Sequence, residues 1–294
     1  MDSTFNQAVL HTLVYADLFD YPLSYRELHR QLQGLEIAYP EFLTTLERSR
    51  GSSPWRELPG GFLGLPGRTQ ALGSHQERRQ RAAGLLDRAI AGGRSIARLP
   101  YVRMVALTGG VAAGNALPED DFDYLIVSQP GRVWLCRAFI ILMVRWMANR
   151  SPRICPNFIV SERRLQFPDH SLYTAMEIVQ MIPIAGMPVY RRLRAENRWV
   201  DMVLPNAGGP PGFTPSEPSG RIGSQMLEGV MDATVGGRLE SWEMTRKVGR
   251  FSRMDNSSTE ICFDQDRCQG HFGGHREQTL RRYTAQLIKL GLIG

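Results

Sequence analysis

The stretch at residues 106–127, ALTGGVAAGNALPEDDFDYLIV, constrains the fold of this chain more than any other segment. An apolar run leads into the pair Gly109-Gly110, and an acidic cluster then leads into a second apolar run. We therefore predict two strands that are separated by a glycine turn. Asp121 and Asp123 hold alternate positions at the start of the second predicted strand, so their carboxylates share one face of it. Because like charges repel, this arrangement indicates that a positively charged partner binds there.

The rest of the chain has the composition of a globular protein. Its 294 residues, 43% of them hydrophobic and 22% charged, suffice for one large domain or two ordinary ones. The net charge of +6 mildly favours anionic partners such as nucleotides or nucleic acid. Four cysteines in a chain of this length do not indicate a disulfide framework, and the first residues do not have the pattern of a signal peptide. The most apolar run, residues 133–148, is shorter than a membrane span and contains two arginines. We therefore expect a cytoplasmic protein that has no membrane contact.

The order of predicted elements indicates an α/β (α+β) core with a mixed sheet, over residues 69–205. Apolar patterns predict strands at 101–108, 122–128 and 154–161, and helices at 133–148 and 172–186. Residues 206–220 are rich in Pro, Gly and Ser and are predicted to be a linker or a mobile loop. Residues 221–294 are predicted to form a helical C-terminal region, with helices near 221–250 and 276–291.

Residues 1–68 are predicted to form a winged-helix-like segment. Residues 5–18 have helical spacing, and a capping box begins at Ser24 with Glu27 three positions later. A helix is predicted at 39–50, and a hairpin is predicted around residues 59–61. A winged helix binds nucleic acid, whereas the same elements also suit a helical cap that has no such role. Residues 68–98 then form an arginine-rich helix, which is either a solvated face or a surface near a phosphate.

The opening stretch has the parts that phosphoryl and nucleotidyl transfer require. A glycine pair after a strand lets backbone N–H groups approach a phosphate, because no Cβ stands in the way. Asp121 and Asp123 provide the oxygen ligands that Mg²⁺ prefers, and Mn²⁺ accepts the same ligands. Such a metal ion binds phosphate oxygens and stabilises the attacking and leaving oxygens. The sequence therefore predicts a site for a nucleoside triphosphate such as ATP and a divalent cation.

This stretch resembles the signature of the polymerase-beta-type nucleotidyltransferase superfamily, in particular its minimal members. The order of segments along the chain also looks like that of uncharacterised bacterial nucleotidyltransferase-domain proteins. The resemblance implies that Asp121 and Asp123 bind the metal and that the glycines of the turn bind the triphosphate. The matching positions are Gly109 and Gly110 for the glycine pair, Ala112 and Gly114 for the small-residue turn, and Asp121, Phe122, Asp123 and Tyr124 for the strand.

The chain departs from this signature at two positions of the turn and at one position of the site. Gly110 stands where serine is common, and Ala113 stands where a basic residue often binds phosphate. The superfamily usually has a third carboxylate on a later strand, but residues 154–161 contain no acid. Asn157 is the polar residue nearest to that position, and Glu177 in the next predicted helix is the alternative.

Other polar residues allow two interpretations each. Arg132 either contacts the triphosphate or lies exposed in a turn. Trp199 either packs in the core or stacks on a base. Cys268, His271 and His275 have a spacing that suits zinc, but the glycines between the two histidines argue against a continuous helix. The candidates for a fourth ligand are Cys262, Asp264 and Asp266.

The sequence thus predicts a nucleotidyltransferase that moves a nucleoside monophosphate from a nucleoside triphosphate to an acceptor. Asp121 and Asp123 would hold Mg²⁺, Gly109 and Gly110 would hold the triphosphate, and Asn157 or Glu177 would complete the site. The acceptor is left open between a small molecule, a nucleic acid and a protein. The alternative is a catalytically silent regulatory protein that binds nucleotides or nucleic acid.

Overall fold

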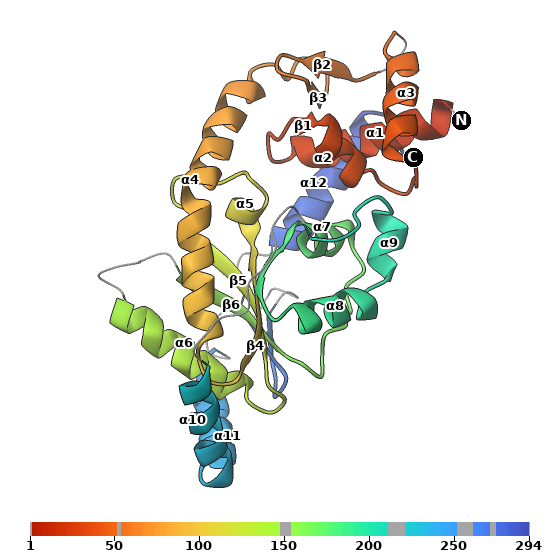
Figure 1. The fold of residues 1–294 in the computed structure, drawn as a ribbon. Helices are drawn as coiled ribbons and strands as arrows, with labels where there is room; N and C mark the ends of the chain where they lie inside the picture. The colour runs from red at the N-terminus through yellow and green to blue at the C-terminus, as the bar shows by residue number, and fades with distance from the viewer. Residues whose placement is uncertain are drawn as a thin grey trace.

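The computed structural model describes residues 2–51, 54–147, 154–210, 221–251, 261–270 and 275–293 (Figure 1). The N-terminal segment lies at one end of the molecule, next to the last helix of the chain, α12 (His275–Lys289). Its elements are α1 (Asp2–Asp17), β1 (Leu23–Ser24), α2 (Tyr25–Arg30), α3 (Tyr39–Ser49), β2 (Arg56–Leu58) and β3 (Phe62–Gly64).

The N-terminal segment contains the local features that the sequence predicts. Ser24 caps α2: its side-chain oxygen accepts a hydrogen bond from the backbone N–H of Glu27, and its own N–H donates to Glu27 Oε2 at 2.9 Å. The predicted capping box is therefore confirmed. The predicted hairpin is also confirmed, because β2 and β3 pair antiparallel around residues 59–61, and β1 pairs with the other edge of β3.

A mixed sheet forms the centre of the molecule. Among the described residues it has six strands in the order β7-β4-β5-β6-β9-β8. The pair β5·β6 is parallel and the other neighbours are antiparallel, so the predicted mixed sheet is confirmed. The bounds of the strands are β4 (Val102–Thr108), β5 (Phe122–Ser128), β6 (Ile154–Ser161), β7 (Ile182–Ala185), β8 (Ile261–Phe263) and β9 (Arg267–Gly270).

Helices cover both faces of this sheet (Figure 1). On one face, α4 (Ala71–Ala97) and α6 (Val133–Met147) share an apolar core with the sheet. On the other face, α7 (Leu172–Gln180), α8 (Met187–Glu196), α9 (Trp199–Val203) and α12 share a second core. None of the described helices combines the length and the apolar character that crossing a lipid bilayer requires.

The prediction of one helix over residues 172–186 is wrong. The helix α7 ends at Gln180, and residues 182–185 form the strand β7 at the edge of the sheet. Pro183 explains the change, because a proline inside a helix removes a hydrogen bond and its ring clashes with the preceding turn. An edge strand tolerates proline, and all four residues of β7 are buried against the sheet.

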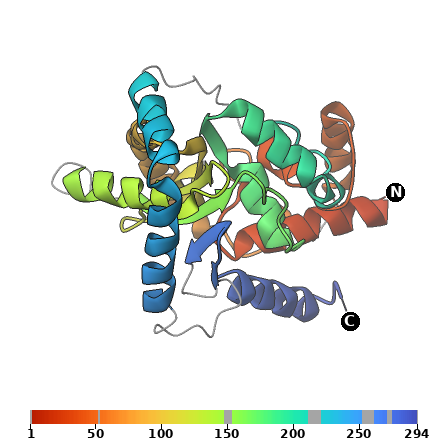
Figure 2. The ribbon, with the colours of Figure 1, turned by 90° about the horizontal axis from the view of Figure 1, so that it is seen from below.

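The C-terminal region docks on the core through buried carboxylates. The helices α10 (Ile222–Ala233) and α11 (Gly236–Phe251) pair with each other, and α11 packs on α6 (Figure 2). Glu240 of α11 accepts hydrogen bonds from the N–H groups of Trp134 and Leu135, at 2.9 and 2.8 Å, in the first turn of α6. Glu228 of α10 accepts one from the N–H of Tyr101 at 2.6 Å. These carboxylates satisfy buried backbone donors that would otherwise lack partners.

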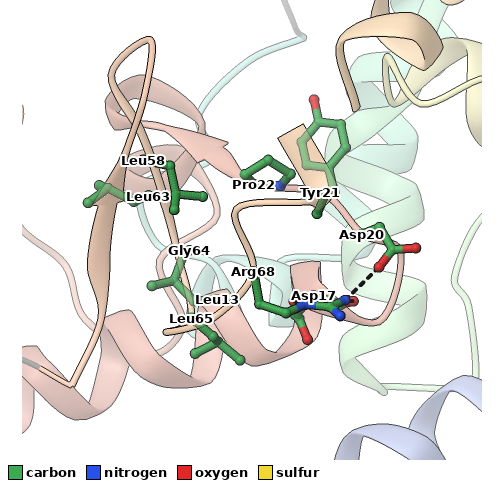
Figure 3. A pocket seen from close by; sticks show the side chains of 11 residues that line it. Leu13, Asp17, Asp20, Tyr21, Pro22, Leu58, Leu63, Gly64, Leu65 and Arg68 are labelled. Carbon is green, nitrogen blue, oxygen red and sulfur yellow. Dashed lines mark hydrogen bonds and ion pairs between the residues drawn. The ribbon is translucent and has the colours of Figure 1, made fainter. Parts of the chain in front are cut away.

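An ion-pair cluster ties α1 and the turn after it to the segment that precedes α4 (Figure 3). The guanidinium of Arg68 donates from Nε to Asp17 Oδ1 and from Nη2 to Asp20 Oδ1, both at 2.5 Å. The cavity beside this cluster has a volume of only about 10 Å³, which suits one water molecule rather than a ligand. The cluster therefore has a structural role, because it holds α1 and the turn that follows it against the segment between β3 and α4.

His75 makes the contact between α4 and the N-terminal segment sensitive to pH. Its side chain is fully buried between Tyr21 and Phe62, and neither ring nitrogen has a hydrogen-bond partner among the described residues. Burial lowers the pKa of His75 below its ordinary value of 6.5, and this effect exceeds the opposing attraction of Glu27. Below pH 6.5 the unfolded chain therefore binds more protons than the folded chain. We expect the contribution of His75 to the free energy of unfolding to be fully present above pH 6.5 and to be lost as the pH decreases.

The substitution His75→Phe tests this expectation. Phe keeps the aromatic contacts and cannot be protonated. When the pH falls from 7.5 to 5, the variant should therefore lose less stability than the native chain. At pH 7.5 the variant should be more stable by about 1 kcal/mol, because two buried polar atoms without partners are removed. Urea unfolding at both pH values measures the two effects, and an unchanged pH dependence in His75→Phe would contradict them.

Candidate active site

The glycine turn lies directly against two carboxylates. The strand β4 runs into α5 (Gly109–Ala112), and Gly109 has a φ of +70°. A Cβ at Gly109 would lie 2.5 Å from Asp123 Oδ2, and a Cβ at Gly110 would overlap the carboxylate of Asp120. Only glycine at both positions lets the backbone approach these oxygens so closely.

Gly114 ends the turn that Gly109 begins. It has a φ of +71°, and its N–H donates to the carbonyl of Val111 at 3.3 Å. The N–H of Asn115 donates to the carbonyl of Gly110 at 2.8 Å. These two bonds form a Schellman motif, which requires a left-handed residue at the position of Gly114. The structure thus gives Gly114 a backbone role in shaping the turn.

Asp123 projects from the sheet toward α7. In β5, Phe122 and Tyr124 belong to the core under α4 and α6, whereas Leu125 and Val127 belong to the core under α7. Because side chains alternate between the faces of a strand, Asp123 shares the face of Leu125. This is why a carboxylate in the middle of the molecule is only half-buried and borders a cavity.

The Asp123 carboxylate is held among negative charges. Burial, with the nearby charges of Asp121 and Asp120, raises the pKa of Asp123 to about 6. Asp121 directly precedes β5, and its side chain is exposed. Within the described part of the chain, neither Asp121 nor Asp123 has a hydrogen bond or an ion pair on its carboxylate. An unpaired, half-buried carboxylate beside a second one is the environment that a bound cation stabilises.

Glu177 faces Asp123 from the opposite side of the same cavity. It lies in α7, where Ser171 caps the first turn by accepting a hydrogen bond from the N–H of Thr174. Burial, with the charge of Asp123, raises the pKa of Glu177 to about 7. No hydrogen bond or ion pair to its carboxylate occurs among the described residues. The structure therefore brings Glu177 and Asp123 together.

The structure places Arg132 away from this point, and it does not describe the side chain of Asn157. The backbone of Asn157 lies in β6, next to β5, but its side chain is outside the described residues. Arg132 follows the far end of β5, where its guanidinium forms an ion pair with Asp232 at 2.8 Å and lies over the ring of Tyr101. Arg132 is therefore separated from Asp123 by the length of the strand.

Of the residues considered for zinc, the structure describes Cys268 and His275 but not His271. Cys268 is buried in β9, His275 begins α12, and His271 lies outside the described residues. In the ranges that the structure describes, no group of three or more His, Cys, Asp or Glu side chains is arranged to hold a metal ion. The pair of Asp121 and Asp123 is consistent with this, since Mg²⁺ takes one or two carboxylates and completes its ligands with phosphates and water.

Trp199 and its neighbours have structural roles. Trp199 is buried and stacks on His170 with ring centroids 4.6 Å apart, so the interpretation of Trp199 as a core residue is confirmed. Asn197 is fully buried, and its side chain bonds to the backbone groups of Phe167, Leu165 and Leu193. These contacts fix the loop that leads into α7.

Two cavities meet beside Asp123 and Glu177. The sheet cavity, of about 400 Å³, lies between the sheet, α7 and the start of α12, and Asp123 lines it. The glycine-turn cavity, of about 410 Å³, lies between the N-terminal segment, the glycine turn and α7, and Gly110 lines it. Both are lined by Gly109, Tyr173 and Glu177, so they adjoin at these residues.

Sequence analysis does not identify several residues of these cavities. Tyr173 stands at the junction, and Arg267 and Arg276 line the sheet cavity opposite Asp123. No motif marks these positions, because α12 and β9 reach the site only through long-range packing. In the structure, Arg276 forms an ion pair with Asp169 at 3.4 Å.

Comparisons of the chain with models of protein families, with curated proteins and with solved structures find no match. The function is therefore inferred from the arrangement of the site itself.

Proposed function

We propose that this protein is a nucleotidyltransferase, which moves a nucleoside monophosphate from a nucleoside triphosphate to an acceptor hydroxyl. One observation carries the proposal: the unpaired carboxylate of Asp123, with the charge of Asp121 close by, lies directly against the glycine turn, whose backbone approaches it because Gly109 has no Cβ. Two cavities that meet at this turn support it, because the reaction has two substrates whose reacting atoms must come together.

The residues at the site fit a divalent cation. Asp123 and Asp121 would hold Mg²⁺, which supplies positive charge to the phosphate oxygens when it is bound. The backbone N–H groups of Gly109 and Gly110 would bind the triphosphate. Arg267 and Arg276 also line the sheet cavity, where Arg276 pairs with Asp169, and they add positive charge there. The acidic pair alone would repel the polyphosphate, so these cationic and N–H groups are needed for substrate binding.

The reaction needs only one proton acceptor from the chain. The acceptor oxygen attacks the α-phosphorus, the bond from this phosphorus to the bridging oxygen breaks, and pyrophosphate leaves with the electron pair. Glu177 lies where the two cavities adjoin, and it would accept the proton of the attacking hydroxyl. This role gives Glu177 the place of the third carboxylate that residues 154–161 lack.

The N-terminal segment supports the proposal of a winged-helix-like unit. Its elements follow the order α1-β1-α2-α3-β2-β3, and its sheet has the order β1-β3-β2. The exposed face of α3, however, carries Glu41 and Glu47 beside Arg48 and is not basic. This face does not favour phosphate contacts along DNA. We therefore propose that the N-terminal segment contributes to binding the acceptor and does not bind DNA.

A labelling experiment tests the activity. The full chain is incubated with each α-³²P nucleoside triphosphate, Mg²⁺, and separate mixtures of small hydroxylated metabolites, RNA or protein. Labelled product and pyrophosphate should appear together, a chelator should stop both, and excess Mg²⁺ should restore both. Mg²⁺-dependent nucleotide binding without pyrophosphate release would instead support the silent regulatory protein, and absence of nucleotide binding would contradict the transferase and leave only a silent protein that binds nucleic acid.

A further inference from the structure

The helices α10 and α11 turn their acids inward and their large apolar side chains outward. Glu228 and Glu240 are buried against the core, where they bind backbone N–H groups. Seven large apolar side chains of the same segment are between 38% and 74% exposed. A surface helix ordinarily has the reverse distribution, with its apolar side toward the core. We call these seven side chains the α10–α11 face: Ile222, Met226, Leu227, Val230, Val235, Leu239 and Trp242.

The exposed side of α10 forms a ridge. Ile222, Met226 and Val230 follow one another at intervals of four residues, which places them in one row along the helix. Met226 and Val230 each stand two residues from Glu228, so the row lies on the side of the helix that faces away from the core. A Cβ at Gly229 would meet no atom within 4 Å, so the row beside the ridge is open. Rows of this spacing pack into one another where two helices cross.

The size of the α10–α11 face matches that of a protein interface. The exposed fractions of its seven residues are equivalent to about four fully exposed ones, or roughly 800 Å² at about 200 Å² for each large residue. A monomer rarely leaves more than a few hundred Å² of contiguous apolar surface. One partner of a standard protein–protein interface buries about 800 Å². We therefore expect another surface to cover this face in the assembled protein.

The chain itself supplies little to cover the α10–α11 face. Residues 211–220 and 252–260 adjoin α10 and α11 along the chain and lie outside the described residues. Each contains one large apolar side chain, which is Phe213 in the first segment and Met254 in the second. Because two such side chains are too few to cover seven, the cover comes from another molecule.

The charges of α10 favour a protein over a lipid surface as this molecule. Helices that lie on anionic membranes carry Lys and Arg along their polar side. The only charged residues of α10 are the acids Glu228 and Asp232, and Asp232 pairs with Arg132 at 2.8 Å. Arg221, which precedes α10, is directed inward, where it donates to the carbonyl of Val102 at 2.7 Å. The outward side of α10 is therefore uncharged, and two copies of it meet without repulsion.

We propose that the α10–α11 face is the interface of a symmetric homodimer, in which α10 packs across α10 of a second copy of this chain. This inference does not depend on the proposed function. In a two-fold dimer the same patch meets itself, and an uncharged ridge with an open row beside it satisfies that requirement. Both helices protrude at the end of the molecule opposite to the N-terminal segment (Figure 1). Among the described residues, none from α10 or α11 lines the sheet cavity or the glycine-turn cavity, so dimerisation leaves both cavities accessible.

Sedimentation velocity on the full chain tests the oligomeric state. Interfaces of this size give dissociation constants in the micromolar range or below, so at about 100 µM the sedimenting mass should be twice that of one chain. Because the face is apolar, the dimer should persist when about 0.5 M sodium chloride screens the charges. A chain that sediments as a monomer at the highest concentration would overturn the inference.

Two matched variants locate the interface. Met226→Glu places a charge in the middle of the ridge, where dimerisation would desolvate it, and should raise the dimer Kd at least about 100-fold. Ile288→Glu makes the same change at an exposed side chain of α12 and should leave the Kd within about twofold of the native value. Equal Kd values for the two variants would overturn the inference.

A neutral variant guards against a folding defect in Met226→Glu. Met226→Ser removes apolar surface from the ridge without adding a charge, and it should raise the dimer Kd at least about tenfold. Far-UV circular dichroism should show the same helix content in the native chain and in all three variants. A native Kd in Met226→Ser would also overturn the inference.

A vesicle experiment tests the rival occupant. Arg238 of α11 is exposed next to Leu239, so anionic lipid is the alternative to a second copy. The native chain is mixed with vesicles of phosphatidylcholine alone, or with phosphatidylserine added, and is floated on a density gradient. The chain should remain in the vesicle-free fraction in both cases. Flotation with phosphatidylserine vesicles that Met226→Glu abolishes would overturn the inference in favour of a lipid surface.

Discussion

The substitution Asp123→Asn is expected to lower the kcat/KM for nucleotidyl transfer by about 10³-fold or more. Asn keeps the shape of the side chain but lacks the negative charge that a divalent cation requires, so Mg²⁺ would no longer be placed at the α-phosphate. The rate of pyrophosphate release under saturating Mg²⁺ measures the effect. Asp87→Asn, on an exposed face of α4, is the matched control and should retain full activity.

Stability should change in the opposite direction to activity. Asp123 is half-buried beside Asp121 and Asp120 without a partner in the described chain, so its charge opposes folding when no cation is bound. Asp123→Asn should therefore unfold at the same temperature as the native chain or above it, in the absence of Mg²⁺. A variant that loses both activity and stability would indicate that Asp123 has a structural role, and a fully active variant would contradict the proposed function.

The local part of the site could be predicted because short-range rules determine it. Gly109 and Gly114 adopt positive φ values that bound a one-turn helix, and the two glycines are separated by the number of residues that this turn needs. The alternation of β5 places Asp123 on the face opposite to Phe122, and the sequence shows this alternation directly. The capping box at Ser24 is local in the same sense.

The parts that could not be predicted depend on which segments pack together. The strand β7 contains the sequence IPIA, which continues the apolar pattern of α7, so periodicity alone does not separate the two elements. Only Pro183 marks the change. The strands β8 and β9 join the core sheet from the predicted helical C-terminal region, and each is at most four residues long. Segments this short carry too little pattern to be identified.

The sequence also could not predict which charged residues lie near Asp123. Arg132 follows β5 closely along the chain. Because β5 has seven residues and Asp123 lies near its start, Arg132 lies at the opposite end of this strand. Arg276 is far from Asp123 along the chain, yet both line the sheet cavity. Glu177 was a candidate because it lies in the helix after β6, and the packing of α7 on the sheet faces it toward Asp123.

The substitution Gly186→Ala should have the largest effect on stability, about 3–5 kcal/mol in the free energy of unfolding. Gly186 links β7 to α8 at a φ of +79°, where a Cβ would overlap the backbone oxygen of Arg103 and lie 2.7 Å from Met104 Cα. The clash is with backbone atoms of β4, which cannot rotate away as a side chain can. Urea unfolding monitored by circular dichroism measures the change.

Gly208→Ala is the matched control, because a Cβ at Gly208 has no atom within 4 Å and the residue does not have a positive φ. Its stability should stay within about 0.5 kcal/mol of the native chain. A loss of less than about 1 kcal/mol in Gly186→Ala would show that β7 and α8 can shift away from β4.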